Sequence, residues 1–304
     1  MASIVNTNIL SINARKSLSM TNSGLQTAME RLSSGLRVNS SKDDAAGLAI
    51  ANRMNSQIRG MTVAQRNAND GISLAQVAEG SLSTITDTLQ RMRDLALQAA
   101  NDGAIGSSDK NKLNEEFTQL KNEVSRIITN TTFNDQKVLN GDLAAGASVA
   151  ASGSPGSPVA AVPATAGAIF QIGANTGADN RIEFSIDNLA SASGLVDVIG
   201  SGGSIGGSAA ASDIRAVIGN IDTALNSVDS TRAELGAVQN RFAATINNLA
   251  NAIENQSAAR SRIMDADFAV ETANLSRAQI LQQAGTAMLA QANAAPQSVL
   301  GLLQ

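Results

Sequence analysis

The sequence predicts a mainly α-helical protein, an antiparallel helical bundle or coiled-coil rod with a terminal helix pair, a small β-hairpin and a low-complexity middle. Two observations support this fold class. Apolar side chains recur at spacings of three and four residues in both halves of the chain, which is the period of one face of an α-helix. Between the halves, from about Leu143 to Ser212, the chain is rich in Gly, Ala and Ser and contains three of the four prolines.

The N-terminal segment is the first helix candidate, because Leu18, Leu25 and Leu32 recur at intervals of seven residues. The motif "SSKDDAAGLAI" follows it and places Ser and Asp before an apolar run, as the start of a second helix requires. The Asp43–Asp44 and Asp265–Asp267 pairs could bind a cation, but helix caps and solvated turns explain these carboxylates better.

Four further apolar stripes predict long helices in the body of the chain. The first two consist of Ala75, Ala78, Leu82, Ile85, Leu89, Met92, Ala96 and Ala99, and of Leu113, Phe117, Leu120, Val124 and Ile127. The later two consist of Ile214, Ile218, Ile221, Leu225 and Val228, and of Leu235, Val238, Phe242, Leu249 and Ile253. Each stripe needs an apolar partner, and the core of an antiparallel bundle that joins the first and last thirds of the chain is the simplest one.

The middle of the chain differs in kind from these helices. Its composition, as in "AAGASVAASGSPGSPVAAVPATAG", is expected to bury too little apolar surface to fold into a compact core. Within it, residues 169–172 and 181–186 flank a turn rich in Gly, Asn and Asp, which predicts a β-hairpin at about 168–187. Because isolated hairpins are marginally stable, this one is expected to lie against the helices.

The C-terminal segment repeats the interval of seven at Leu281 and Met288 and then ends in "VLGLLQ". The large apolar residues of that end are Val299, Leu300, Leu302 and Leu303. Burying these four contributes about 6–12 kcal/mol, whereas ordering the last ten or so residues costs about 10–20 kcal/mol of backbone entropy. We therefore expect ends that are loose in the monomer and ordered by neighbouring copies; the alternative is that the ends dock onto their own bundle.

Composition excludes most site chemistry, because the chain has no Cys, His, Trp or Tyr. Ordinary zinc and iron–sulfur sites and imidazole-based catalysis are therefore ruled out, and no glycine-rich phosphate-binding motif opens a helix. A net charge of −4 argues against a nucleic-acid surface. No run of 18 apolar residues and no general secretory signal are found, so neither a membrane span nor that export route is expected. We expect no enzyme and no cofactor.

Three long segments closely resemble bacterial flagellin. They are "RLSSGLRVNSSKDDAAGLAIANRM" at 31–54, "NANDGISLAQVAEGSLSTI" at 67–85 and "NLSRAQILQQAGTAMLAQANAAPQSVLGLLQ" at 274–304. The similarity covers roughly 1–143 and 210–304, and "FQIGAN" in the hairpin also resembles the family. The resemblance implies a subunit of the extracellular flagellar filament that is exported unfolded by the flagellar type III apparatus and added at the distal end beneath a cap.

The resemblance also implies a domain plan. Residues 1–45 and 256–304 would form the two halves of an inner-tube helical domain, 46–143 and 212–255 the halves of a rod domain, and 144–211 a short variable segment. Self-assembly would use residues of the terminal helices, namely Leu18, Leu25, Leu32, Leu281, Met288, Val299, Leu300, Leu302 and Leu303. Because the middle leaves room for the hairpin and little else, we expect a thin, smooth filament.

The implied partners are further copies of the chain, a flagellin export chaperone with the type III apparatus, and the filament cap and hook-junction proteins. The motif "LQRMRDLALQ" at 89–98 also resembles the segment read by the vertebrate flagellin-specific Toll-like receptor. It places the implied receptor contacts on Arg91, Leu95 and, with a shift of one residue, Glu116. The terminal "VLGLLQ" similarly resembles the end read by cytosolic inflammasome sensors.

Two other functions compete with the filament subunit, and the first of them remains open. A hook–filament junction protein shares the terminal helix design, although "SRAQILQQAGTAMLAQAN" is closer to filament flagellin. A coiled-coil signalling protein or adhesin would require a membrane span or an ordered binding head, and the sequence shows neither.

Overall fold

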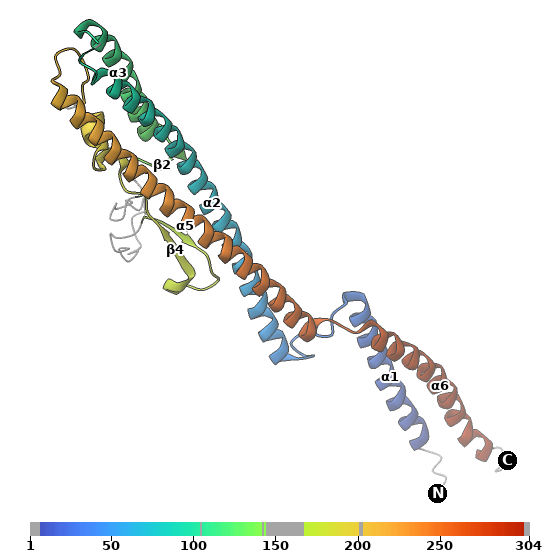
Figure 1. Cartoon of the computed structure of the whole chain (residues 1–304). Helices are drawn as coiled ribbons and strands as arrows, with labels where there is room; N and C mark the ends of the chain where they lie inside the picture. The colour runs from blue at the N-terminus through green and yellow to red at the C-terminus, as the bar shows by residue number, and fades with distance from the viewer. Residues whose placement is uncertain (1–6, 104, 142, 144–166, 201–202, 301–304) are drawn as a thin grey trace. The chain divides into compact units, whose positions relative to one another are not determined.

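The computed structural model describes residues 7–103, 105–141, 143, 167–200 and 203–300, with side chains described as far as residue 294. The fold is mainly helical, as predicted. Its long helices are α1 (Ile9–Ser34), α2 (Ala45–Ala99), α3 (Ser107–Asn130), α5 (Ala211–Met264) and α6 (Phe268–Leu300) (Figure 1). The chain divides into two compact units. Unit 1 comprises Met1–Ile58 with Glu254–Gln304, and unit 2 comprises Arg59–Ile253.

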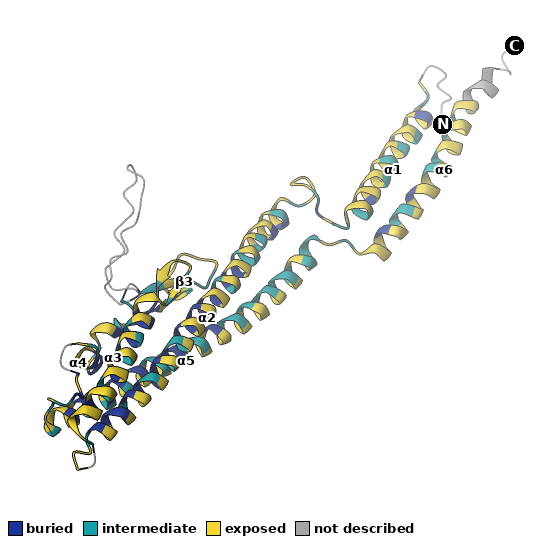
Figure 2. Ribbon diagram, turned by 90° about the horizontal axis from the view of Figure 1, so that it is seen from above, coloured by how far each residue is buried: buried dark blue, intermediate teal, exposed yellow. Residues whose placement is uncertain are grey.

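Unit 2 contains the apolar core, which lies between the α2, α3 and α5 segments of this unit. All eight residues of the predicted stripe from Ala75 to Ala99 are fully buried there. They meet Phe117 and Val124 of α3 and buried residues of α5 that include Ile214, Ile221 and Val228. Figure 2 shows these buried positions as dark blue faces on the three helices. The helix stripes are thus confirmed as core faces, except at Leu249 and Ile253, which are half-buried and lie outside the described core clusters.

The predicted hairpin is confirmed as β3 (Ala168–Gln171) paired antiparallel with β4 (Arg181–Phe184), with Phe170 opposite Ile182. The 3₁₀ turn η1 (Ala178–Asn180) lies in its loop. The Phe170 ring meets the Phe242 ring of α5 edge to face, with the ring centroids 5.5 Å apart. Asn67 Nδ2 of α2 donates to the Gln171 carbonyl at 2.9 Å. The hairpin therefore lies against the helices, as a two-stranded ribbon needs to.

The middle is expected to bury too little apolar surface for a compact core, yet its second half adds to the core that the long helices form. Residues 182–205 supply a run of buried apolar side chains to unit 2. These are Ile182, Phe184, Ile186, Leu189, Leu195, Val198 and Ile205. They lie on β4, on the 3₁₀ turn η2 (Leu189–Ser191), on α4 (Leu195–Ile199) and on the connections between them. Short segments with scattered apolar residues can reach the core because the long helices supply the rest of it.

A second small hairpin escaped the sequence interpretation. β1 (Thr132–Phe133) pairs antiparallel with β2 (Gln136–Lys137) directly after α3. The two turn residues, Asn134 and Asp135, both have positive φ, 50° and 64°. Asn and Asp tolerate this left-handed conformation, and a type I′ turn requires it at both central positions.

Unit 1 is built differently, because it contains the helix pair formed by α1 and α6 and none of the described apolar core clusters. Within α1 only Ser11 and Ala28 are buried. The helix ends at Gly35, whose φ of 70° places it in the left-handed conformation typical of a helix C-terminal cap. The pairing of the two terminal helices agrees with the predicted fold class.

Candidate self-assembly surface

The contact between α1 and α6 is a narrow seam of small and half-buried side chains. Leu18, Leu25 and Leu32 are half-buried along α1, and Ala278 is buried on α6. Leu18 lies close to Gly285, where an added Cβ would be 3.3 Å from the leucine Cδ1. Leu18 therefore belongs to the seam within one chain, and Leu25 and Leu32 continue its row along α1 at intervals of seven.

Polar contacts cross the same seam at four places. The Asn8 Nδ2 donates to the Ala292 carbonyl at 2.7 Å, and the Ser11 hydroxyl donates to Asn293 Oδ1 at 2.8 Å. Further along, the Gln282 Nε2 donates to Asn22 Oδ1 at 3.0 Å. At the other end of the pair, Arg31 Nη1 donates to Glu271 Oε1 at 3.0 Å, which is an ion pair. These four contacts follow one antiparallel register.

Large apolar side chains on the other faces of the pair point to solvent. The predicted residues Leu281 and Met288 are among them, 51% and 65% exposed. The full set in the described part of the pair is Ile9, Leu10, Ile12, Met20, Met29, Phe268, Val270, Ile280, Leu281 and Met288. Single exposed apolar residues are ordinary, but ten on two helices expose more large apolar side chains than a helix pair needs for itself. We call this set the apolar face of unit 1.

The four predicted assembly residues at the C-terminal end lie largely outside the described part of the chain. α6 continues to Leu300, so Val299 and Leu300 are helical, but their side chains lie outside the described residues. Leu302 and Leu303 lie outside the described residues altogether. The sequence interpretation missed most of the apolar face, including Ile9, because its members do not recur at the spacings that mark a helix stripe.

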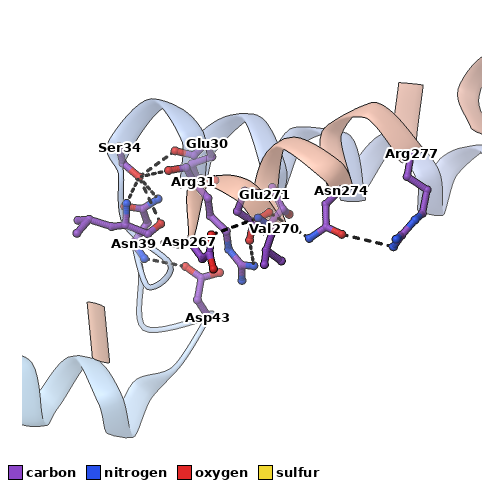
Figure 3. A network of polar contacts seen from close by, with 12 residues as sticks. Glu30, Arg31, Ser34, Asn39, Asp43, Asp267, Val270, Glu271, Asn274 and Arg277 are labelled. Atoms are coloured by element: carbon purple, nitrogen blue, oxygen red, sulfur yellow. Dashed lines mark hydrogen bonds and ion pairs between the residues drawn. The ribbon is translucent and has the colours of Figure 1, made fainter. Parts of the chain in front are cut away.

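The junction between the terminal helices and their neighbours is held by backbone and carboxylate hydrogen bonds (Figure 3). Leu36 and Asp265 form an isolated antiparallel bridge, and Arg37 N donates to the Met264 carbonyl at 2.6 Å. The Asp43 carboxylate accepts from Ser40 N, Ser40 Oγ and Asn39 N. These bonds, with Ser40 N making the largest contribution, hold the pKa of Asp43 below its usual range. Asp43 thus stabilises the turn that precedes α2, whereas Asp44 caps the helix, because its Oδ1 accepts from Gly47 N at 2.8 Å.

The three residues implied as receptor contacts do not share one environment. Arg91 on α2 and Glu116 on α3 form an exposed ion pair, with Nη2 to Oε1 at 2.7 Å and Nε to Oε1 at 2.9 Å. Leu95, one helical turn from Arg91, is only 2% exposed and belongs to the core of unit 2. The structure therefore brings the two charged residues together at the surface and places the leucine beneath it.

Among the described residues, no group of three or more His, Cys, Asp or Glu side chains is arranged to hold a metal ion. In the same part of the chain, no helix is long and apolar enough to cross a membrane.

Comparisons with known proteins agree on one family. The model of the bacterial flagellin N-terminal helical region matches residues 5–144, and that of the C-terminal helical region matches residues 218–303. Flagellin A of Vibrio anguillarum is 37% identical over 380 residues and is aligned over 100% of both chains. Flagellin A of Vibrio cholerae is 38% identical over 376 residues, with 99% of each chain covered.

These alignments are longer than the 304 residues of this chain, so the relatives contain residues with no counterpart here. A crystal structure of Bacillus cereus flagellin matches with a TM-score of 0.45 and 26% identity, covering 60% of this chain and 88% of that one. The assignment rests on the two family models and the full-length relatives. Together they show that the chain belongs to the bacterial flagellins, the structural, non-enzymatic subunits of the extracellular filament that serves motility.

Proposed function

We propose that copies of this chain assemble into the flagellar filament through the apolar face of unit 1. The observation that carries this proposal is that ten large apolar side chains are exposed on a pair of helices outside the described core clusters. Fully burying one such side chain contributes about 1.5–3 kcal/mol. Neighbouring subunits therefore offer the terminal helices the packing that the isolated chain does not provide.

The predicted assembly residues divide into two roles under this proposal. Leu18, Leu25 and Leu32 hold α1 against α6 within one subunit, since they are half-buried at the seam. Leu281 and Met288 contact neighbouring subunits, since they are exposed. The sequence alone supports a contact between the apolar end and neighbouring copies. This end consists of Val299, Leu300, Leu302 and Leu303.

We also propose the domain plan that the resemblance implies, with 1–45 and 256–304 as the inner-tube domain and 46–143 and 212–255 as the rod domain. Residues 144–211 are the variable segment, and its shortness supports a thin, smooth filament. The two compact units follow the same order along the chain, although their bounds at residues 58 and 254 differ from this plan.

Seeded polymerisation followed by electron microscopy tests the assembly surface. We expect the double variant Leu281→Ser/Met288→Ser to stay monomeric, because it removes apolar surface without touching the seam. Gln283→Ser/Gln291→Ser, at exposed polar positions of the same helix, is the matched control and should form normal filaments. Normal filaments from the first variant would remove the role given to these two residues.

A chain lacking 295–304 should likewise stay monomeric, and its polymerisation would contradict the role of the apolar end.

Export and the accessory partners are a further part of the proposal. A chain without cysteine cannot form premature disulfides while it is unfolded, which suits passage through a narrow channel. The proposed partners are the export chaperone, the type III apparatus, the filament cap and the hook-junction proteins. Secretion should stop in cells that lack the flagellar export apparatus, and continued secretion would contradict this route.

The hook–filament junction alternative is disfavoured because the full-length relatives are flagellins.

Recognition by the flagellin-sensing Toll-like receptor is a second candidate function. It is supported by the exposed Arg91–Glu116 ion pair, since two residues implied separately by the resemblance are in contact. Leu95 would act from beneath by supporting α2, because its side chain is buried. Monomeric Arg91→Ala should activate the receptor less than the parent, whereas Arg126→Ala, which removes an exposed arginine paired with Glu123, should not. Equal activation by Arg91→Ala and the parent would overturn the assignment.

A further inference from the structure

The leucine repeat of α1 cannot by itself fix how α1 and α6 are aligned. Leu18, Leu25 and Leu32 recur at intervals of seven, so a slip of seven residues replaces one leucine by the next. The facing side of α6 has the same ambiguity, since Ala278, Gly285 and Ala292 also recur at intervals of seven. An antiparallel pair with such repeats has several alignments of similar apolar contact.

The backbone bridge between Leu36 and Asp265 and the polar side chains at the seam both oppose a slip, and among these side chains the Arg31–Glu271 pair is the strongest contact. Glu271 has a side chain only 9% exposed, and that of Arg31 is 30% exposed. Among the described side chains, this is the only ion pair that joins α1 to α6. The second carboxylate oxygen of Glu271 accepts from Asn274 Nδ2 at 3.4 Å, which holds the carboxylate in place (Figure 3).

A slip of seven residues would separate Arg31 from Glu271. In one slipped alignment Glu271 would face Gly24 of α1 and would be buried there without a cation, because Arg31 would face the position of Met264. Leaving a buried charge unpaired is strongly unfavourable, even where the intact pair adds little net stability. The ion pair therefore acts against wrong alignments more than it stabilises the right one.

We propose that Arg31 and Glu271 form a register lock, which selects one alignment of α1 against α6. Within the proposed function, on which this inference rests, the alignment decides which residues of the two helices stand side by side on the apolar face. A slipped pair would present Leu281 and Met288 beside the wrong part of α1. Arg31 and Glu271 are thus positioning residues for assembly and do not themselves contact the neighbouring subunit.

Engineered disulfides can read the register directly, because the chain has no cysteine of its own. The pair Asn22→Cys/Gln282→Cys reports the native alignment, since these side chains are hydrogen-bonded across the seam. Asn22→Cys with Leu275→Cys, and Asn22→Cys with Leu289→Cys, report slips of seven residues in the two directions. Each pair is oxidised under the same mild conditions in the full-length monomer. The same three cysteine pairs are used in the parent chain and in each variant, so any effect of the cysteines themselves is the same in all of them.

In the parent background we expect the native pair to cross-link about tenfold faster than either shifted pair. Glu271→Gln should reduce this preference to about threefold or less, because the slipped alignment no longer leaves a buried charge unpaired. The exchanged double variant Arg31→Glu/Glu271→Arg should restore the parental preference. Glu30→Gln and Lys16→Gln, at exposed positions of α1, are the matched controls and should leave it unchanged.

An undiminished preference in Glu271→Gln would overturn the lock, and so would failure of the exchanged variant to recover it. Polymerisation of the reduced chains is measured separately. A parent chain that keeps the native register but forms no filaments would contradict the proposed function and leave the lock standing. Filaments from a Glu271→Gln chain with slipped cross-links would show that assembly does not depend on the register, and would overturn the role given to the lock.

Discussion

Gly71 of α2 is required by the ring that packs on it. A methyl group at this position would lie 2.7 Å from Cζ and 2.9 Å from Cε2 of Phe242, closer than packed atoms approach. Both groups belong to unit 2, so Gly71→Ala should lower its free energy of unfolding by about 1–3 kcal/mol through overpacking. Gly80→Ala is the control, because nothing lies within 4 Å of its added methyl group. It should raise stability by about 0.5–1 kcal/mol. Urea unfolding of the monomer measures both, and equal effects would contradict the packing argument.

Asp43 gives the loop between α1 and α2 a defined dependence on pH. Its folded pKa is lowered, mainly by the Ser40 N–H. The carboxylate therefore stabilises the loop above its unfolded pKa of about 3.9, and this contribution is lost as the pH falls through the lower folded value. We expect the Ser40 amide shift in NMR spectra to titrate with a midpoint below about 3.9. In Asp43→Asn the titration should disappear, and a midpoint at or above the unfolded value would contradict the assignment.

At the scale of elements, the sequence predicts helices best where one face is continuously apolar. The stripe from Ala75 to Ala99 is a complete core face in the structure, because three- and four-residue spacings place all its members on one side of α2. Leu249 and Ile253 continue the stripe of α5 but are only half-buried. The pattern therefore identifies a helix and its face but not the depth of burial, which depends on what lies opposite.

Elements without a periodic pattern could not be predicted in the same way. The buried residues of α4 and η2, such as Val198 and Leu189, stand among Gly, Ser and Ala, and their burial depends on helices distant in the sequence. The same holds for the candidate site. Leu281 and Met288 were found by their spacing, but their outward orientation follows from Ala278 and Gln282 facing α1 instead. Contacts such as Arg31–Glu271 join residues 240 positions apart and leave no local signal in a single sequence.

The β3–β4 hairpin should depend on its one aromatic contact with α5. Phe170→Ala removes the edge-to-face packing on Phe242 and should destabilise the hairpin by about 1–3 kcal/mol. Ile169→Ala, at the neighbouring exposed position, should change its stability by less than about 0.5 kcal/mol. Amide hydrogen exchange of residues 168–184 measures both. Faster exchange throughout unit 2 in Phe170→Ala would show that the hairpin does not open as a separate element.

At the scale of the whole molecule, the core lies in one unit and the exposed apolar surface of the terminal helices in the other. The described core clusters lie between Leu74 and Leu235 and around Ala68, Ile182 and Phe242, all within unit 2. The helix pair of unit 1 relies instead on a thin seam. Local stability follows buried apolar contact, so the two units should differ in their resistance to unfolding.

We therefore expect the monomer to lose helix in two steps on heating. The first step should correspond to α1 and α6, which have 26 and 33 residues, and the second to unit 2. Assembly should raise the temperature of the first step, because neighbouring copies bind the paired helices but not the unfolded ends. Far-UV circular dichroism of monomers and sheared filaments measures both steps, with amide exchange to assign them. A single transition in the monomer, or a first step that is unchanged in filaments, would contradict the idea that neighbouring subunits stabilise the terminal helices.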